Sequence, residues 1–356
     1  MRNAILLLAF VFSCGCDGNP AVSSRPDSVS DIRADETVVL FRSSAWLDEE
    51  RDEWHLPVHG WIYEPQDSVV RKSAFRRVLK RKYGLEVTSD NEDNFSERLN
   101  LVIADNERGK RIVVSLAEQR YVLPKSAKNG HFEDTLVLSA ADVARHARNG
   151  FIDYSAVTRD KESRTFRGTI RLVEPAGLSV ISDIDDTVKI SQVRDRPRLL
   201  ENTFLKDFAA APGMAARYRA WADAGANFHF VSSSPWQLYE PLRAFMDATD
   251  FPWATFSLKA VRFKDETLFD LFKKGTDTKP NQIRAILDRY PNRHFVLIGD
   301  SGEQDPEVYA EFLPTTVTIP TGAFVSGSDD VEPLVADGSS EIDLKLHNLE
   351  LGDRVE

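Results

Sequence analysis

Two hydrophobic patterns divide the chain near residue 175. Over 36–175, short segments rich in β-branched and aromatic residues alternate with turn residues such as Asn129-Gly130. This alternation is typical of antiparallel strands, and the number of segments fits two packed sheets. We therefore expect an antiparallel β-sandwich-like domain over 36–175. Its expected strands are 38–42, 58–63, 99–103, 111–115, 135–138, 152–157 and 166–173.

One segment inside this domain has a helical period instead. From Ser68 to Tyr83, just before Gly84, apolar residues recur every three or four positions, which predicts a helix. The apolar stripe consists of Val70, Ala74, Phe75, Val78 and Leu79. The rest of this 71–82 helix is basic, and such a face either rests on an anionic lipid surface or is simply solvated. The basic positions are Arg71, Lys72, Arg76, Arg77, Lys80, Arg81 and Lys82.

The second half of the chain alternates buried-strand and helix patterns. Apolar runs that suit buried strands are separated by longer segments with helical periodicity, and this order predicts right-handed crossovers and a parallel sheet. We expect a Rossmann-like α/β domain over 176–322, followed by a C-terminal tail over 323–356. The expected strands are 178–182, 228–231, 255–258 and 294–299, and the expected helices are 213–224, 237–247 and 276–290.

The first of these strands ends in an acidic motif. Asp183 and Asp185 follow the run 178–182, and Thr187 comes two residues later. Because side chains alternate along an extended segment, both acids can point the same way, one for nucleophilic attack or metal binding and one for proton transfer. The alternative is an acidic turn in which Asp186 or Thr187 caps the helix that follows.

Polar residues also follow the later strands. Ser232 opens a serine triplet after the second run, and its hydroxyl and the backbone donors there suit a phosphate oxygen. Lys279 begins the helix before the last run, which ends in Asp300 and is followed by Asp305. Strand ends of a parallel sheet meet at one edge, so these residues are expected to form one site.

This order of motifs resembles the haloacid dehalogenase superfamily, whose members hydrolyse phosphate esters with Mg²⁺ on a Rossmann-like sheet. The segments 182–191, 228–239 and 297–309 are similar to the catalytic domain of the actin-patch-type phosphatidate phosphatases. The resemblance covers about 178–319 and extends in kind to the sandwich-like region before it.

The resemblance implies a role for each motif residue. Asp183 would attack phosphorus, and Asp185 would protonate the leaving alkoxide and then activate water. Ser232 and Lys279 would bind phosphoryl oxygens. Thr187 is assigned to phosphate binding with them and would stabilise the loop after the acidic motif. The metal set for Mg²⁺ is Asp183, Asp185 through its backbone carbonyl, Asp300 and Asp305.

Three of these assignments have alternatives. Ser233 or Ser234 could bind phosphate in place of Ser232, because the triplet blurs the alignment. Lys273 or Lys274 could replace Lys279, which would then be a surface lysine at a helix start. Asp305 could act only as the N-cap of a helix that begins at Pro306.

The expected function is Mg²⁺-dependent hydrolysis of phosphate monoesters through an aspartyl-phosphate, with phosphatidate converted to diacylglycerol and phosphate. The alternatives are a phosphatase of soluble phosphomonoesters and a catalytically idle surface-binding module; the presence of Asp183 argues against the latter. Trp236 and Tyr239 could contact the lipid or belong to the core. The net charge of −11 opposes a nucleic-acid partner.

The N-terminus has the pattern of an export signal. A short charged start and the apolar run 4–12 precede Cys14 and Cys16, the only cysteines of the chain, and 1–16 resembles a bacterial lipoprotein signal. The expectation is an exported protein of the periplasm or cell envelope, lipid-anchored at Cys14 or Cys16, with 17–35 as a flexible tether. Ordinary cleavage near Gly15 or Gly18 is the alternative.

Overall fold

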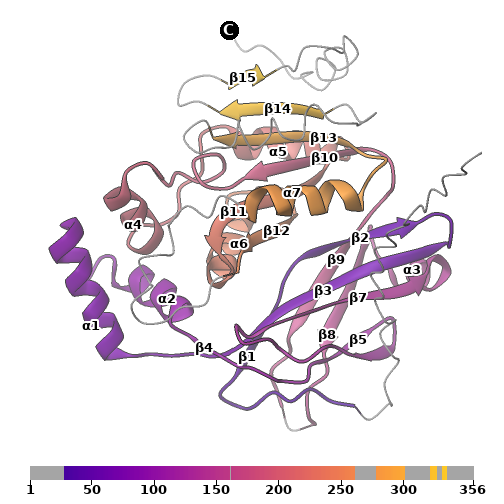
Figure 1. Cartoon of the computed structure of the whole chain (residues 1–356), viewed down its shortest axis with the longest axis horizontal. Helices are drawn as coiled ribbons and strands as arrows, with labels where there is room; N and C mark the ends of the chain where they lie inside the picture. Colours follow the sequence, from indigo (N-terminus) through magenta and orange to yellow (C-terminus); the bar gives the residue numbers. More distant parts are fainter. Residues whose placement is uncertain (1–27, 161, 261–277, 301–320, 327–330, 335–356) are drawn as a thin grey trace, which may run out of the picture.

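Two β-sheets and the helices around them make up the described part of the chain (Figure 1). The computed structural model describes residues 28–160, 162–260, 278–300, 321–326 and 331–334. The predicted signal and most of the predicted tether, 1–27, lie outside these ranges. Within them, no helix combines the length and apolar character needed to cross a bilayer.

The first sheet is formed by nine strands between residues 37 and 173. The hydrogen-bonded order is β1-β3-β2-β9-β8-β5-β6, with β4 and β7 also paired to β3. Most pairs are antiparallel as expected, but β2 pairs with β9 in parallel, so the sheet is mixed. A division into two facing sheets stays a prediction. The strands are β1 Thr37–Leu40, β2 Ser43–Asp48, β3 Glu53–Glu64, β4 Asp105–Asn106, β5 Val113–Leu116, β6 Gln119–Val122, β7 His131–Ser139, β8 Phe151–Ala156 and β9 Arg167–Val173.

One strand expected in this half is wrong. Residues 99–103 belong largely to helix α2, Glu92–Val102, and not to a strand. The β-branched run at its end suggested a strand, but Phe95, Leu99 and Val102 lie on one helical face and are all buried. Packing of that face decides the local structure. A short helix α3, Ala140–His146, was also not anticipated.

The predicted basic helix is confirmed as a helix. It comprises α1, Val69–Val78, and a π-helical turn, Leu79–Tyr83, and it ends at Gly84, whose φ of 69° suits glycine. The predicted apolar stripe is only partly correct. Phe75 and Leu79 are buried, whereas Val70 is 76% exposed.

The second sheet has the order β12-β11-β10-β13-β14-β15. All neighbours are parallel except β14 and β15, which are antiparallel. Because β14 pairs with β13 over residues 321–326, the predicted boundary between 322 and 323 falls inside a strand. The strands are β10 Leu178–Asp183, β11 Asn227–Pro235, β12 Ala254–Lys259, β13 His294–Asp300, β14 Thr321–Ser326 and β15 Val331–Leu334, and the helices are α4 Arg196–Phe204, α5 Met214–Asp223, η2 Trp236–Leu238, α6 Tyr239–Ala248 and α7 Thr278–Arg289.

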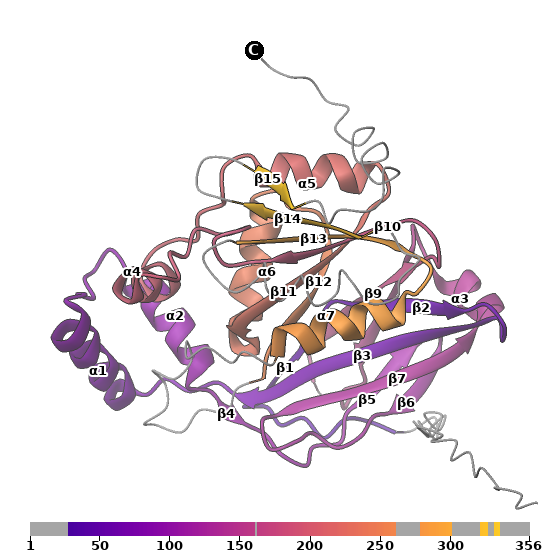
Figure 2. The same cartoon turned by 45° about the horizontal axis from the view of Figure 1, so that its top comes forward.

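Alternate residues of the central strands face two different cores. Val180 of β10 belongs to the core shared with α2, α4, α5 and α6, whereas Ile181 faces the core that contains α7. Helix α7 lies between the two sheets (Figure 2). The Tyr290 hydroxyl, just after α7, donates to Ser44 Oγ of β2 at 2.7 Å. Helix α7 is therefore held by both halves of the chain.

An aromatic cluster also joins the two halves. Phe41 packs on Trp236 and Tyr239 with ring centroids 4.3 and 4.8 Å apart, and both of these residues are buried. The Tyr239 hydroxyl accepts the Arg42 backbone N–H at 3.0 Å. Trp236 and Tyr239 therefore belong to the core, which is one of the two alternatives left open by the sequence.

The segment that leads into β10 is fixed by Arg293. This buried guanidinium donates to Ser179 Oγ at 2.8 Å, to the Glu174 carbonyl at 2.7 Å and to the Ala176 carbonyl at 2.5 Å, and also to the Leu178 carbonyl. One buried side chain thus holds three backbone carbonyls and the buried Ser179 hydroxyl in place.

We predict that Arg293→Ala lowers the free energy of unfolding by about 3 kcal/mol, because the buried Ser179 hydroxyl and three backbone carbonyls lose their shared donor and a large buried side chain is removed. Urea unfolding followed by circular dichroism measures the change. Arg167→Ala, at an exposed position, is the matched control and should stay within about 0.5 kcal/mol. A loss below about 1 kcal/mol for Arg293→Ala would show that the segment does not depend on this guanidinium.

Candidate active site

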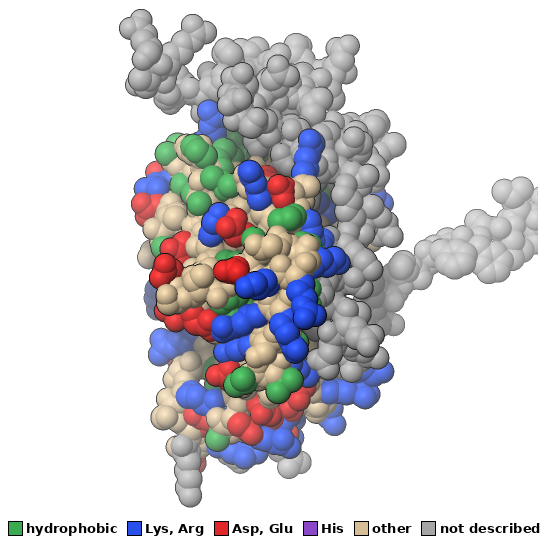
Figure 3. Space-filling view, turned by 90° about the vertical axis from the view of Figure 1, so that its left-hand side faces the viewer, with side chains coloured by type: hydrophobic (Ala, Val, Ile, Leu, Met, Phe, Trp, Pro, Cys, Tyr) green, Lys and Arg blue, Asp and Glu red, His purple; other side chains and the backbone are tan. Residues whose placement is uncertain are grey.

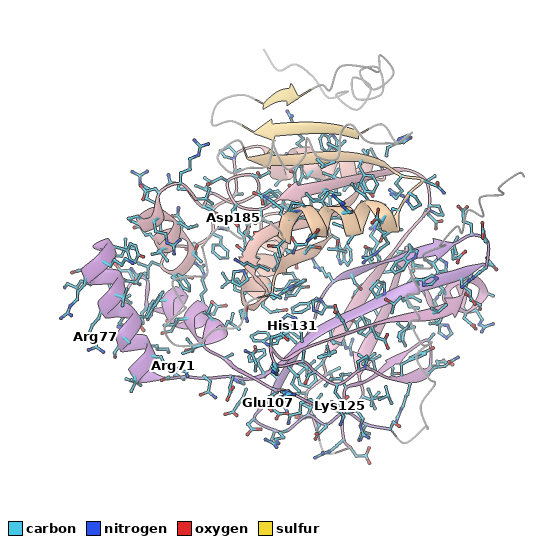
Figure 4. All side chains as sticks on the ribbon, in the orientation of Figure 1. Arg71, Arg77, Glu107, Lys125, His131 and Asp185 are labelled. Carbon is cyan, nitrogen blue, oxygen red and sulfur yellow. The ribbon has the colours of Figure 1, made fainter. Side chains whose placement is uncertain are left out.

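The predicted motif residues meet at the carboxyl-terminal edge of the parallel sheet. In the register, Ser182 of β10 pairs with Phe230 of β11 and with Ile298 of β13. Asp183, Ser232 and the backbone of Asp300 therefore lie at the same edge. Figure 4 labels Asp185 beside this edge, on the side of the molecule where α4 lies.

Asp183 is paired with a lysine from α7. The side chain is 1% exposed, and the Lys279 Nζ lies 2.9 Å from its Oδ1. Lys279 is itself buried, so the alternative of a surface lysine is wrong. Lys273 and Lys274 lie outside the described residues. A carboxylate in such a place needs a neighbouring positive charge, because burial without one is costly.

Asp185 accepts from several donors. Its Oδ1 accepts from Ser191 Oγ at 2.6 Å and lies 3.0 Å from Lys189 Nζ. Its Oδ2 accepts from Ser232 Oγ at 2.9 Å and from Ser234 Oγ at 3.0 Å. Lys189 Nζ also donates to Ser191 Oγ. Each donor favours the charged form of the acid.

The network sets the protonation state of Asp185. Burial alone raises the pKa of this carboxyl, but the charge of Lys189 and the hydrogen bonds from Ser191, Lys189 and Ser232 outweigh that effect and lower the pKa to about 2. Asp185 is therefore a carboxylate at neutral pH in the ligand-free protein.

The loop after β10 is organised by Asp186. Its φ is 59°, and its carboxylate accepts the backbone N–H groups of Ser191 and Gln192, each at 2.7 Å, and that of Val193 at 2.8 Å. The alternative in which Asp186 or Thr187 caps the following helix is wrong. Helix α4 begins only at Arg196, and Asp195 is its N-cap.

Thr187 lies inside this loop. The residue is fully buried, and its Oγ1 has no hydrogen-bond partner within the ranges that the structure describes. A buried hydroxyl of this kind is available to an oxygen ligand. The assignment of Thr187 to phosphate binding stays a prediction.

The serine triplet divides into two inward-facing residues and one outward-facing residue. Ser232 and Ser234 both reach Asp185, and the backbone N–H of Ser234 also donates to Ser232 Oγ at 2.9 Å. Ser233 is exposed, as expected from the alternation of side chains along a strand. Ser232 and Ser234 are thus the members of the triplet that can face a ligand at this edge.

The predicted metal ligands are only partly covered by the structure. Asp300 ends β13 at the correct edge, but its side chain and Asp305 lie outside the described part. Among the side chains that are described, no group of three or more His, Cys, Asp or Glu residues could hold a metal ion. The predicted donors that the structure describes, the Asp183 carboxylate and the Asp185 backbone carbonyl, are hard oxygen atoms of the kind that Mg²⁺ prefers.

Two residues of the network were missed from the sequence. Lys189 and Ser191 both contact Asp185. Ser234, which also contacts Asp185, was considered only as an alternative phosphate ligand. A lysine and a serine close behind an acidic strand end could have signalled such a loop. Their contact with Asp185 depends on the turn at Asp186, which the sequence does not specify.

The lowered pKa of Asp185 predicts a pH-dependent contribution to stability. A carboxyl whose folded pKa lies below its unfolded value stabilises the fold above the unfolded pKa, near 4, and this contribution is lost as the pH falls towards 2. We expect the difference in unfolding free energy between the wild type and Asp185→Asn to shrink by about 2 kcal/mol between pH 5 and pH 2. Urea titrations of both proteins test this, and a difference independent of pH would contradict the assigned network.

The part of the chain that contains the candidate active site is similar to known proteins. Residues 178–318 match the family described as phosphatidate phosphatase APP1, catalytic domain. An uncharacterized protein of Schizosaccharomyces pombe is 31% identical over 159 residues, which is 44% of this chain and 26% of that protein. Phosphatidate phosphatase APP1 of Saccharomyces cerevisiae is 34% identical over 154 residues, which is 42% of this chain and 25% of the yeast protein.

The matched region is about a quarter of each curated relative. It begins at β10 and contains Asp183, Asp185, Ser232 and Lys279, the residues that meet in the structure. The predicted resemblance to the catalytic domain of phosphatidate phosphatases is therefore confirmed. Over residues 178–318, the chain is similar to the catalytic domain of phosphatidate phosphatases.

Proposed function

We propose that this protein is a Mg²⁺-dependent phosphatase that hydrolyses phosphatidate to diacylglycerol and phosphate through an aspartyl-phosphate. The observation that carries the proposal is the arrangement of two buried carboxylates at one strand end, each with its own lysine. Ser232 hydrogen-bonds to the second acid and lies at the same edge. A nucleophile, an acid–base group and oxyanion donors are thus available together.

In this mechanism Asp183 is the nucleophile. The neighbouring Lys279 ammonium, 2.9 Å from Oδ1, favours the ionised and therefore nucleophilic carboxylate. Attack forms a bond from a carboxylate oxygen to phosphorus as the bond to the ester oxygen breaks. The same ammonium can then neutralise charge on a phosphoryl oxygen in the transition state.

Asp185 serves as the acid and then as the base. Its ionised form in the ligand-free protein is the one needed to take a proton from the water that hydrolyses the aspartyl-phosphate. Protonation of the leaving alkoxide needs the opposite form. A bound phosphate brings negative charge next to Asp185 and raises the pKa of its carboxyl, which favours uptake of that proton.

The metal assignment rests on the type of donors. Asp183, the backbone carbonyl of Asp185 and Asp300 would hold Mg²⁺, with Asp305 orienting its surroundings. When bound, the ion offsets the repulsion between a carboxylate and a phosphate. Ser232, Ser234 and Thr187 supply uncharged hydroxyl groups near the same place.

The substrate is inferred from the yeast relative, which is a phosphatidate phosphatase. The chain's own residues define the phosphate end of the reaction and leave the rest of the substrate open. Soluble phosphomonoesters are therefore the comparison against which a lipid preference has to be measured.

We expect Asp183→Asn to lower kcat by at least about 1,000-fold, because the amide is not a nucleophile. Phosphate release from phosphatidate in detergent micelles measures the effect. Asp223→Asn, an exposed acid on α5, removes the same charge and should retain full activity. Wild-type activity in Asp183→Asn would rule out the aspartyl-phosphate.

A second test concerns the substrate and the metal. The kcat/KM for phosphatidate in micelles should exceed that for p-nitrophenyl phosphate by on the order of tenfold or more, and EDTA should reduce both by on the order of 100-fold until Mg²⁺ is restored. A preference for the soluble ester would overturn the lipid assignment alone. Activity that is unchanged in EDTA would overturn the role of the metal.

A further inference from the structure

The helix α1 has a buried side and an outer side. Phe75 and Leu79 are 3% and 0% exposed, and the Phe75 ring lies 6.0 Å from Phe95 of α2 and 5.2 Å from Phe204 of α4. These contacts fix α1 on the body of the protein. At 100° per residue, Val70 and Arg77 share the face opposite Phe75.

The outer side begins with two exposed valines. Val69 and Val70 are 74% and 76% exposed, the two highest values for large apolar side chains in the described ranges. The others are Ile190 at 40% and Val137 at 36%. Because apolar surface is more stable out of water, two adjacent exposed valines suit contact with an apolar environment.

Cations without an acidic partner follow the valines along α1 and the π-helical turn after it. Three of the basic side chains have acidic partners, in the pairs Lys72–Asp67, Arg76–Glu92 and Lys80–Glu86. Arg77, Arg81 and Lys82 form no ion pair with any residue that the structure describes. This local positive charge stands out in a chain of net charge −11. Figure 3, which faces this side of the molecule, shows Lys and Arg side chains gathered over it.

The outer side of α1 lies on the same side of the molecule as the candidate active site. Figures 1 and 2 both show α1, α2 and α4 together on this side. The Phe75–Phe204 contact joins α1 to α4, and α4 follows the Asp185 loop directly. Ile190 of that loop is among the few exposed large apolar residues. A surface bound to α1 would therefore also lie near the loop that carries Asp185.

We propose that the outer side of α1 docks the protein on an anionic bilayer surface. Val69 and Val70 enter the boundary between headgroups and acyl chains. Arg77 of α1 faces the lipid phosphates, together with Arg81 and Lys82 of the π-helical turn that follows α1. A basic face with an exposed apolar end is the pattern of helices that lie in a membrane interface. The basic residues that form ion pairs are explained as a solvated face. The basic residues without ion pairs and the two valines are the ones that we assign to the lipid surface. The docking gives the proposed lipid phosphatase access to its substrate, but binding is measurable without catalysis.

The test uses the full chain and vesicles that contain no phosphatidate. Binding is measured by flotation in low salt on phosphatidylcholine vesicles, with and without roughly 30% phosphatidylglycerol to make the surface negative. The quantity compared between variants is the affinity for the anionic vesicles divided by the affinity for the neutral vesicles. Any binding through the apolar segment 4–12 is expected for both kinds of vesicle, so it cancels in the ratio of affinities.

Arg77→Gln/Arg81→Gln/Lys82→Gln should lower this ratio by on the order of 100-fold, at about fivefold for each cation. Val69→Ser/Val70→Ser should weaken binding to the anionic vesicles by about tenfold. Lys125→Gln/Lys128→Gln/Arg167→Gln removes the same charge from exposed positions on the other half of the chain and should leave the ratio unchanged.

Two outcomes decide the proposal. Equal loss in the α1 and control triple variants would show a general charge effect and overturn docking through α1, as would unchanged binding in the α1 variants. Hydrolysis of p-nitrophenyl phosphate, measured in parallel, should be retained by all three variants. If binding changes as expected but no variant or wild type hydrolyses phosphatidate, the docking stands and the proposed lipid phosphatase fails.

Discussion

The candidate active site depends on positive charges that neutralise two carboxylates buried at the end of one strand. A buried carboxylate without a partner is costly, so Asp183 and Asp185 each require a nearby cation. Lys279 supplies it for Asp183 from α7, and Lys189 supplies it for Asp185 from the loop after β10. The two lysines come from different directions, so the acids are compensated separately and can take different chemical roles.

The position of Lys279 links the two halves of the chain. Helix α7 packs on the parallel sheet through Ile283 and Ile286, and the hydroxyl of Tyr290 bonds to Ser44 of the first sheet. Phe41 of the first half packs on Trp236, which follows the serine triplet. The β-rich half therefore supports the elements that hold the site, and α1 attaches to the same body through Phe75.

Much of the site could be predicted from the sequence because its parts are local. Asp183, Asp185, Ser232 and Lys279 follow apolar runs or begin a helix, and strand ends of a parallel sheet meet at one edge. The interactions that depend on tertiary packing could not be predicted. Lys189 and Ser191 reach Asp185 only because the chain turns at Asp186. The left-handed backbone of Asp186 could not be predicted from the sequence pattern.

The fold shows the same division between local and tertiary effects. The buried strands β10, β11 and β13 were predicted from continuous apolar runs. The strand expected at 99–103 is part of α2, because burial of Leu99 and Val102 on a helical face outweighs the β-branched residues there. From the sequence, Trp236 could either contact a ligand or lie in the core. It lies in the core because Phe41, nearly 200 residues away in sequence, packs on it.

The central claim is that Asp183 forms a covalent bond to phosphorus. The most direct measurement is a single turnover with phosphatidate labelled in its phosphate, quenched in acid and digested for peptide mapping. The account predicts transient label on the peptide that contains Asp183, acid-stable and released by hydroxylamine, and no label in Asp183→Asn. Phosphate release at the wild-type rate without any labelled intermediate, or label on another residue, would contradict it.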